Sequence, residues 1–178
     1  MRQRPAIPQL PYEGGCLCGA VRYRVDALPM AINACHCRDC RKLTGAANLL
    51  MVAVPRDGFH QISGATDRYR KRADSGRDVD LVRCADCGTR LWHEPLASPA
   101  LLFFAAGTLD DPDWAVPTSH IWIEKAAPGT HFHSDAIQVR GQPASSDVLF
   151  DASEPFMPTG NRDCHNNFTQ ARAFLEPG

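Results

Sequence analysis

The sequence predicts a mainly β protein, built as a single domain from several small, curled sheets. The chain has 178 residues, of which 44% are hydrophobic, and this is enough for one domain with its own core. Its apolar and β-branched residues come in short segments separated by turn signals such as Asp57-Gly58, Ser63-Gly64 and Ser75-Gly76. Helical periodicity is sparse along the chain. These observations favour many short strands over helices.

Nine segments are predicted to be strands. Residues 20–26 alternate apolar and basic side chains, which is typical of a half-buried strand. The segments around Trp92 and Trp122 combine aromatic or β-branched residues with strand-like brevity. The predicted strands cover residues 20–26, 31–34, 48–54, 60–63, 66–71, 79–83, 90–93, 101–105 and 120–124.

Two helices are expected. A short one spans residues 38–44 and stops at Gly45, since glycine commonly ends a helix. A second spans residues 166–175, where Phe168, Ala171 and Leu175 share one face.

The chain is expected to contain one domain with two flanking segments. Residues 1–12 are Pro-rich and predicted to be a mobile lead-in, residues 13–140 to form the domain, and residues 141–178 to be a C-terminal extension packed on it. The longest apolar runs, 49–54 and 100–106, fall far short of the about 18 residues that a membrane helix needs. Residues 1–12 also lack the apolar region of a secretory signal. We therefore expect a cytoplasmic protein with no membrane partner and reduced thiols.

The formal net charge of −1 hides an uneven distribution. Lys and Arg outnumber Asp and Glu by 15 to 10 in residues 1–100, but are outnumbered by 10 to 4 thereafter. We favour a solvated strand face for the most basic stretch; the alternative is a rim that attracts a small acidic ligand. Nucleic acid is not expected as a partner, because the stretch is short, is interleaved with aspartates and matches no binding motif. The basic residues are Arg68, Arg70, Lys71, Arg72 and Arg77.

Seven of the eight cysteines fall into three close groups: Cys16 and Cys18; Cys35, Cys37 and Cys40; and Cys84 and Cys87. An even count would permit four disulfides, but such close spacing in a reducing compartment favours metal binding. A structural zinc site takes four ligands, usually two from each of two segments. The two pairs therefore predict one closed zinc site on Cys16, Cys18, Cys84 and Cys87.

The remaining group predicts a second zinc ion of a different kind. Cys35, Cys37 and Cys40 supply three ligands from six residues, which leaves a coordination position for water or substrate, as in catalytic zinc sites. A fourth protein ligand would close this site. The candidates are Cys164, the pair His131 and His133, and His36, although His36 is expected to point away because ligands flank it on both sides.

The cysteine order resembles a known family. Residues 15–19 (GCLCG), 35–45 (CHCRDCRKLTG) and 84–91 (CADCGTRL) are similar to the glutathione-dependent formaldehyde-activating enzymes, a family that includes the centromere protein V type. Residues 119–128 resemble its later His-containing strand, and the match covers residues 13–128. The resemblance implies a β-tent fold, with structural zinc on the two cysteine pairs and catalytic zinc on Cys35, Cys37 and Cys40. The chain departs from the family after residue 126, where relatives often carry a tryptophan.

The resemblance also implies carbon–sulfur lyase chemistry. The enzyme would add glutathione, or a similar thiol, to formaldehyde or another small aldehyde, or reverse that step. A non-catalytic, zinc-stabilised binding module is the alternative, and thiol redox sensing is a third hypothesis. His120 is a candidate acid–base residue or a half-buried structural histidine, and Asp39 either supports the ligands or begins the helix.

Overall fold

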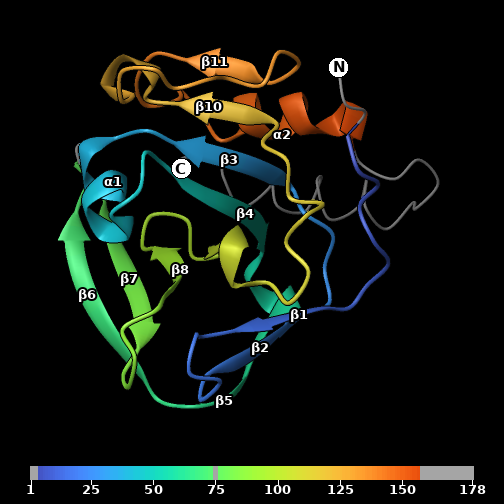
Figure 1. Ribbon diagram of the computed structural model, residues 1–178, viewed down its shortest axis with the longest axis vertical. Coiled ribbons are helices and arrows are strands. Elements are labelled where there is room, and N and C mark those ends of the chain that lie inside the picture. Colours follow the sequence, from blue (N-terminus) through green and yellow to red (C-terminus); the bar gives the residue numbers. More distant parts are fainter. Residues whose placement is uncertain (1–3, 74–75, 157–178) are drawn as a thin grey trace.

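The computed structural model describes residues 4–73 and 76–156, and these residues form a mainly β fold, as predicted (Figure 1). Their strands make two sheets. The smaller sheet is antiparallel, with the order β1 (Tyr12–Gly15), β2 (Arg22–Val25) and β5 (Phe59–Ser63). Cys164 and the predicted helix at 166–175 lie outside the described residues.

The larger sheet has eight strands in the order β11-β10-β3-β4-β9-β8-β7-β6. Its pairs are antiparallel from β3 to β6, whereas β10 runs parallel to both β3 and β11. The strands are β3 (Ala31–Cys35), β4 (Leu49–Pro55), β6 (Thr66–Arg72), β7 (Asp78–Cys84), β8 (Arg90–Pro95), β9 (Leu101–Ala105), β10 (Ser119–Ile121) and β11 (Ile137–Val139).

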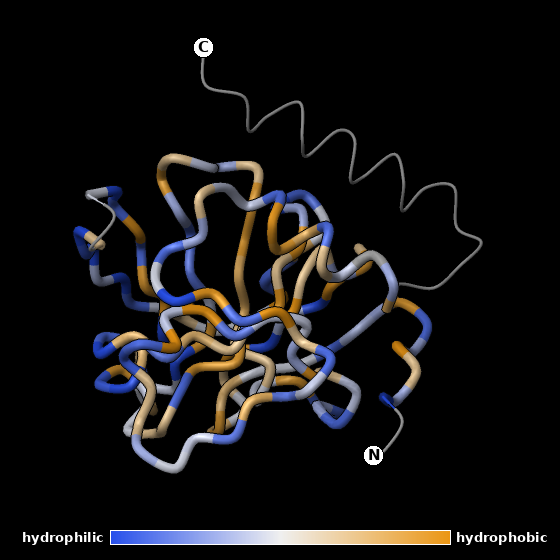
Figure 2. The backbone as a smooth tube through the Cα atoms, turned by 90° about the horizontal axis from the view of Figure 1, so that it is seen from above, coloured by the Kyte–Doolittle hydropathy of each residue, from blue (hydrophilic) through white to orange (hydrophobic). Residues whose placement is uncertain are grey.

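The two faces of the larger sheet have different roles. Alternate residues such as Val52, Trp92 and Phe104 are buried in a core shared with Tyr23 and Phe59 of the smaller sheet. The Phe59 ring lies 5.0 Å from both the Tyr23 and the Trp92 rings, measured between centroids. Since successive strand residues point to opposite faces, the residues between them line the other side of the sheet. Figure 2 shows hydrophobic segments running through the middle of the molecule and hydrophilic ones in the outer turns.

The opposite face is only partly covered. Helix α2 (Asp147–Ser153) packs Leu149 and Phe150 against Met30, Ala31 and Leu101. Helix α1 (Arg38–Thr44) covers the region where β3 ends. Between these two helices the sheet leaves a cavity, described below.

Most predicted elements agree with the structure. Eight predicted strands are present with ends shifted by no more than two residues, and α1 has the predicted bounds. The prediction of a strand over 120–124 was wrong beyond Ile121, because Trp122 adopts a left-handed backbone with φ of 59° and residues Ile123–Lys125 form a 3-10 helix. Sequence patterns missed β1, β11 and α2, each of which has seven residues or fewer.

The remaining irregular segments include short 3-10 helices at Arg56–Gly58, Ala106–Thr108 and Glu154–Phe156. Within the described residues, no helix is both long and apolar enough to cross a membrane.

Replacement of Gly64 by alanine is expected to destabilise the fold. Gly64 has φ of 85°, and an added Cβ would lie 2.4 Å from the carbonyl oxygen of Ala20. Gly129 has φ of 80° with open space around it, so Gly129→Ala is the matched control for backbone strain alone. We expect Gly129→Ala to cost about 1 kcal/mol of unfolding free energy and Gly64→Ala clearly more. Urea denaturation measures both, and equal losses would contradict the steric argument.

Candidate functional site

The two cysteine pairs meet where the two sheets approach each other. Cys16 and Cys18 lie in the connection between β1 and β2, whereas Cys84 ends β7 and Cys87 lies in the turn before β8. Their four sulfurs are within 4.8 Å of one another, with 3.4 Å between Cys16 and Cys18 and 3.9 Å between Cys18 and Cys84. A tetrahedral zinc ion with Zn–S bonds of about 2.3 Å places its sulfurs about 3.8 Å apart. The four-cysteine cluster therefore fits zinc.

Hydrogen bonds favour the thiolate form of two members of this cluster, Cys16 and Cys87. The N–H of Val21 lies 3.1 Å from Cys16 Sγ, and the hydroxyl of Thr89 lies 3.1 Å from Cys87 Sγ. Thr89 lowers the pKa of Cys87 to about 5. Burial opposes ionisation of Cys16, but hydrogen bonds from Val21 and the neighbouring thiols outweigh it and lower the pKa of that thiol. Thiolates are the form that binds metal.

The second cluster lies at the end of β3. Cys35 is the last residue of that strand, Cys37 is the N-cap of α1, and Cys40 lies in the first turn of the helix. The three sulfurs are within 4.8 Å of one another, and the Cys40 N–H donates to Cys37 Sγ at 3.4 Å. The thiols of Cys35 and Cys40, followed by backbone N–H groups, lower the pKa of Cys37. The donor set again suits a soft divalent metal such as zinc.

Within the described residues, the three-cysteine cluster gains no fourth ligand. His131 and His133 belong to no strand, so they do not share a strand face as the sequence alternative required, and they are not part of the cluster. His133 Nδ1 instead contacts the Asp135 carboxylate. His36 is fully buried, and its Nε2 atom lies 3.0 Å from His120 Nδ1 rather than in the cluster.

The histidine contacts define a chain of hydrogen bonds behind the segment of Cys35, Cys37 and Cys40. The backbone N–H of His133 donates to His120 Nε2 at 3.0 Å, so His120 carries its proton on Nδ1 and donates it to His36. Burial lowers the pKa of both imidazoles, that of His120 to about 4, and keeps them neutral near pH 7. Phe132 packs edge-on against both rings. His120 thus orients His36, which lies between two cysteines of the cluster.

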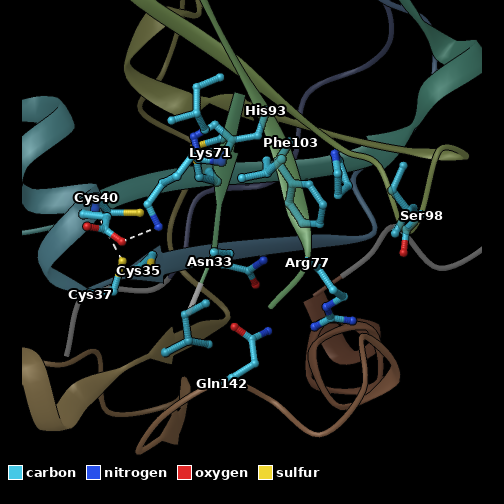
Figure 3. Close-up of a pocket in the computed structure, with 18 of the residues that line it drawn as sticks. Asn33, Cys35, Cys37, Cys40, Lys71, Arg77, His93, Ser98, Phe103 and Gln142 are labelled. Atoms are coloured by element: carbon cyan, nitrogen blue, oxygen red, sulfur yellow. Dashed lines mark hydrogen bonds and ion pairs between the residues drawn. The ribbon is translucent and has the colours of Figure 1, made fainter. Parts of the chain in front are cut away.

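A cavity of about 250 Å³ opens beside the three-cysteine cluster (Figure 3). Alternate residues of the larger sheet form its floor, and α1, α2 and Trp122 form its walls. The four-cysteine cluster does not line it. Its lining includes Cys35, Cys37 and Cys40; the apolar Leu43, Met51, Leu81, Leu101, Phe103, Ile121, Trp122 and Leu149; and the polar Asn33, Asp39, Lys71, Arg77, His93, Ser98, Gln142 and Ser146.

The basic stretch divides between two environments. Arg70 forms a two-point ion pair with Asp80 at 2.8 and 2.9 Å, and Arg68 pairs with Glu94. Lys71 and Arg77 instead line the cavity. Arg68 and Arg70 thus form ion pairs on an exposed face, whereas Lys71 and Arg77 face the cavity together with Asp39 and Asp78, and attraction of an acidic ligand stays a prediction.

Sequence reasoning missed several polar groups near the three-cysteine cluster. Asn33 and His93 line the cavity from β3 and β8, and the buried Nε2 atom of His93 has no hydrogen-bond partner among the described residues. Arg90 has a buried guanidinium whose Nη1 donates to the Val82 carbonyl, while burial lowers its pKa to about 10. A register shift between β7 and β8 beside Arg83 sets the orientation of this part of β8. The sequence gives no local signal for these residues, because their location near the cluster depends on how distant strands pair.

Fold and clusters together define a β protein with two cysteine sites suited to metal, one of which borders a cavity. Residues 11–125 match the model of the family described as "Glutathione-dependent formaldehyde-activating enzyme", so the chain belongs to that family. A Halomonas elongata protein named "Putative glutathione-dependent formaldehyde-activating enzyme" is 30% identical over 102 residues. That alignment covers 55% of this chain and 65% of the relative. A solved Rhodobacter sphaeroides protein aligns with 20% identity and a TM-score of 0.46, covering 55% of this chain and 87% of its own.

The two clusters are expected to respond differently to loss of a ligand. Cys84→Ser should greatly lower the unfolding free energy, because a metal ion held by the four-cysteine cluster would join the two sheets. Cys37→Ser should remove one zinc ion per chain and leave the melting temperature nearly unchanged. Metal analysis and thermal unfolding of both variants test this. Global unfolding of Cys37→Ser, or an unaffected Cys84→Ser protein, would contradict the division of roles.

Proposed function

We propose that the chain is a zinc-dependent enzyme of the carbon–sulfur lyase type. It adds a glutathione-like thiol to formaldehyde or another small aldehyde, or reverses this reaction, at the cluster of Cys35, Cys37 and Cys40. A second zinc ion on Cys16, Cys18, Cys84 and Cys87 has a structural role. Membership of the family supports this activity.

The observation that carries the proposal is the position of the two clusters relative to the cavity. Cys35, Cys37 and Cys40 line it, whereas the four-cysteine cluster joins the sheets away from it. Three protein ligands beside an accessible space is the arrangement expected of a catalytic zinc, and four ligands that of a structural one.

The cavity has room for more than the aldehyde. Its volume of about 250 Å³ far exceeds that of a one-carbon substrate, so the thiol partner accounts for most of the space. Apolar side chains such as Met51 and Phe103 cover its floor, and Asn33 and Gln142 offer amide groups for orientation. This mixture suits a polar, peptide-like thiol better than a simple alkyl thiol.

The reaction needs a thiolate and a polarised carbonyl. Zinc, when bound, would lower the pKa of a substrate thiol or polarise the carbonyl oxygen. The thiolate sulfur attacks the carbonyl carbon, a C–S bond forms, and the C=O electron pair moves to the oxygen, which takes up a proton. The residues of the cavity hold the two partners together and exclude bulk water, so that the addition becomes effectively intramolecular.

The activity is testable by exchange spectroscopy. Thiol–aldehyde addition also proceeds without a catalyst, so the rate must be compared with that of a protein-free sample. The measurement follows ¹³C-formaldehyde as it exchanges between its free form and its adduct with glutathione. The wild-type holoprotein should accelerate this exchange. The Cys37→Ser variant should show only the rate of the protein-free sample. A wild-type rate equal to the background would contradict the enzyme hypothesis and leave the binding-module alternative.

Cys164→Ser serves as the companion variant. If the three-cysteine cluster is open to substrate, this variant should keep two zinc ions per chain and the full exchange rate. Loss of a zinc ion in Cys164→Ser would identify a fourth protein ligand and contradict an open site. Reversible disulfide formation in the zinc-loaded protein on mild oxidation would support the redox alternative instead.

A further inference from the structure

Lys71 reaches Asp39, which lies beside the three-cysteine cluster, from the far edge of the larger sheet. It lies on β6, an edge strand separated from β3 by four others in the sheet order. Its Nζ atom nevertheless lies 2.5 Å from an oxygen of Asp39 on α1 and donates to the Arg72 carbonyl at 3.2 Å. The curl of the sheet makes this contact possible. Figure 3 shows the Lys71 side chain extending toward the loop that carries Cys37 and Cys40.

Strand alternation separates Lys71 from its basic neighbours. Arg70, one residue earlier, points to the opposite face and pairs with Asp80, with 61% of its side chain exposed. The Lys71 side chain is 22% exposed and lines the cavity. Lys71 is therefore the member of this pair whose charge faces the candidate site.

Asp39 holds this charge in place at the reacting end of the cavity. It lies in the first turn of α1, between Cys37 and Cys40, and it lines the cavity with them. Arg77, the other basic residue among the described lining residues, lies toward the opposite end of the cavity in Figure 3, near Ser98 and Gln142. An ammonium fixed beside the cluster meets the negative charge that develops on the substrate.

We propose that Lys71 is a catalytic residue, whose ammonium group donates a hydrogen bond to the aldehyde oxygen, and that Asp39 is its positioning residue. The inference rests on the proposed function and deepens it. As the thiolate sulfur bonds to the carbonyl carbon, the C=O electron pair moves to the oxygen, and Lys71 stabilises the resulting oxyanion until it takes a proton from water. A preorganised donor directed at a developing oxyanion is worth more in a partly buried site than in water.

Lys71→Met tests the charge with little change in side-chain length. We expect kcat/KM for thiol–aldehyde exchange to fall by about 10²- to 10³-fold, the range observed when one oxyanion donor is removed. Zinc content and melting temperature should remain at wild-type values. Lys71→Arg should keep part of the activity, because it preserves the positive charge. Arg70→Met is the matched control, since it removes a cation from the same strand on the opposite face, and it should leave activity unchanged.

Three further readouts separate this role from a purely structural one. Added methylammonium should partly restore the activity of Lys71→Ala, because it replaces the missing ammonium group. No such rescue is expected if Lys71 only connects β6 to α1. Affinity for S-(2-hydroxyethyl)glutathione, a stable hydroxyl-bearing analogue, should fall about tenfold in Lys71→Met by calorimetry. Asp39→Asn should lower kcat more than it raises KM, since it loosens the ammonium without removing it.

The outcomes that overturn the inference are distinct from failure of the proposed function. The inference is overturned if Lys71→Met has the same kcat/KM as the wild-type protein. It is also overturned if activity is lost only in proportion to the loss of zinc or of folded protein and methylammonium does not restore it. If the wild-type protein itself shows no exchange activity, the proposed function fails. Because the catalytic role of Lys71 rests on that activity, the inference then fails as well.

Discussion

The packing of the larger sheet against the smaller one is the interaction on which the rest of the structure depends. One face packs Val52, Trp92 and Phe104 against the smaller sheet, which excludes water from a continuous aromatic and aliphatic core. The other face is covered only at its ends by α1 and α2. Because the sheet twists and curls, the end of edge strand β6 that carries Lys71 approaches α1, although most β6 side chains are exposed. The cavity is the space that this curl encloses.

The cysteine clusters add constraints that packing alone does not supply. Within each cluster the sulfurs lie within 4.8 Å of one another and repel when ionised, so each ionised cluster would favour a bound cation. The four-cysteine cluster joins segments that are 66 residues apart, Cys18 and Cys84, and it does so between the two sheets. Metal binding there is coupled to folding, because the site does not exist in the unfolded chain. The three-cysteine cluster comes from a single loop and makes no such connection.

Several residues hold that loop in place from outside it. The backbone N–H of His133 fixes the tautomer of His120, which in turn contacts His36. Trp122 adopts a left-handed backbone, which is costly for a residue with a bulky side chain, and it packs beside the cluster and lines the cavity. At this point the chain turns out of β10, and the Trp122 side chain packs against Cys35 and Cys40. β10 thus supports this segment on one side through His120, and the ion pair of its own Asp39 with Lys71 connects it to β6 on the other.

The sequence by itself determined the mainly β class, eight of the strands and α1. It did so because alternation, turn dipeptides and Gly45 act locally. It also grouped the cysteines into the two sets that the structure brings together, since sulfur spacing and the four ligands of zinc are local rules. Residues 137–139 and 147–153 carry weak local signals, and only packing against β10 and the face of the larger sheet makes them a strand and a helix.

The tertiary structure alone decided which cluster borders a cavity and which polar side chains share it. Lys71 and Arg70 are adjacent and both basic in the sequence, yet they lie on opposite faces of one strand. Which face meets α1 depends on the curl of eight strands, a property of their long-range pairing that no segment carries on its own.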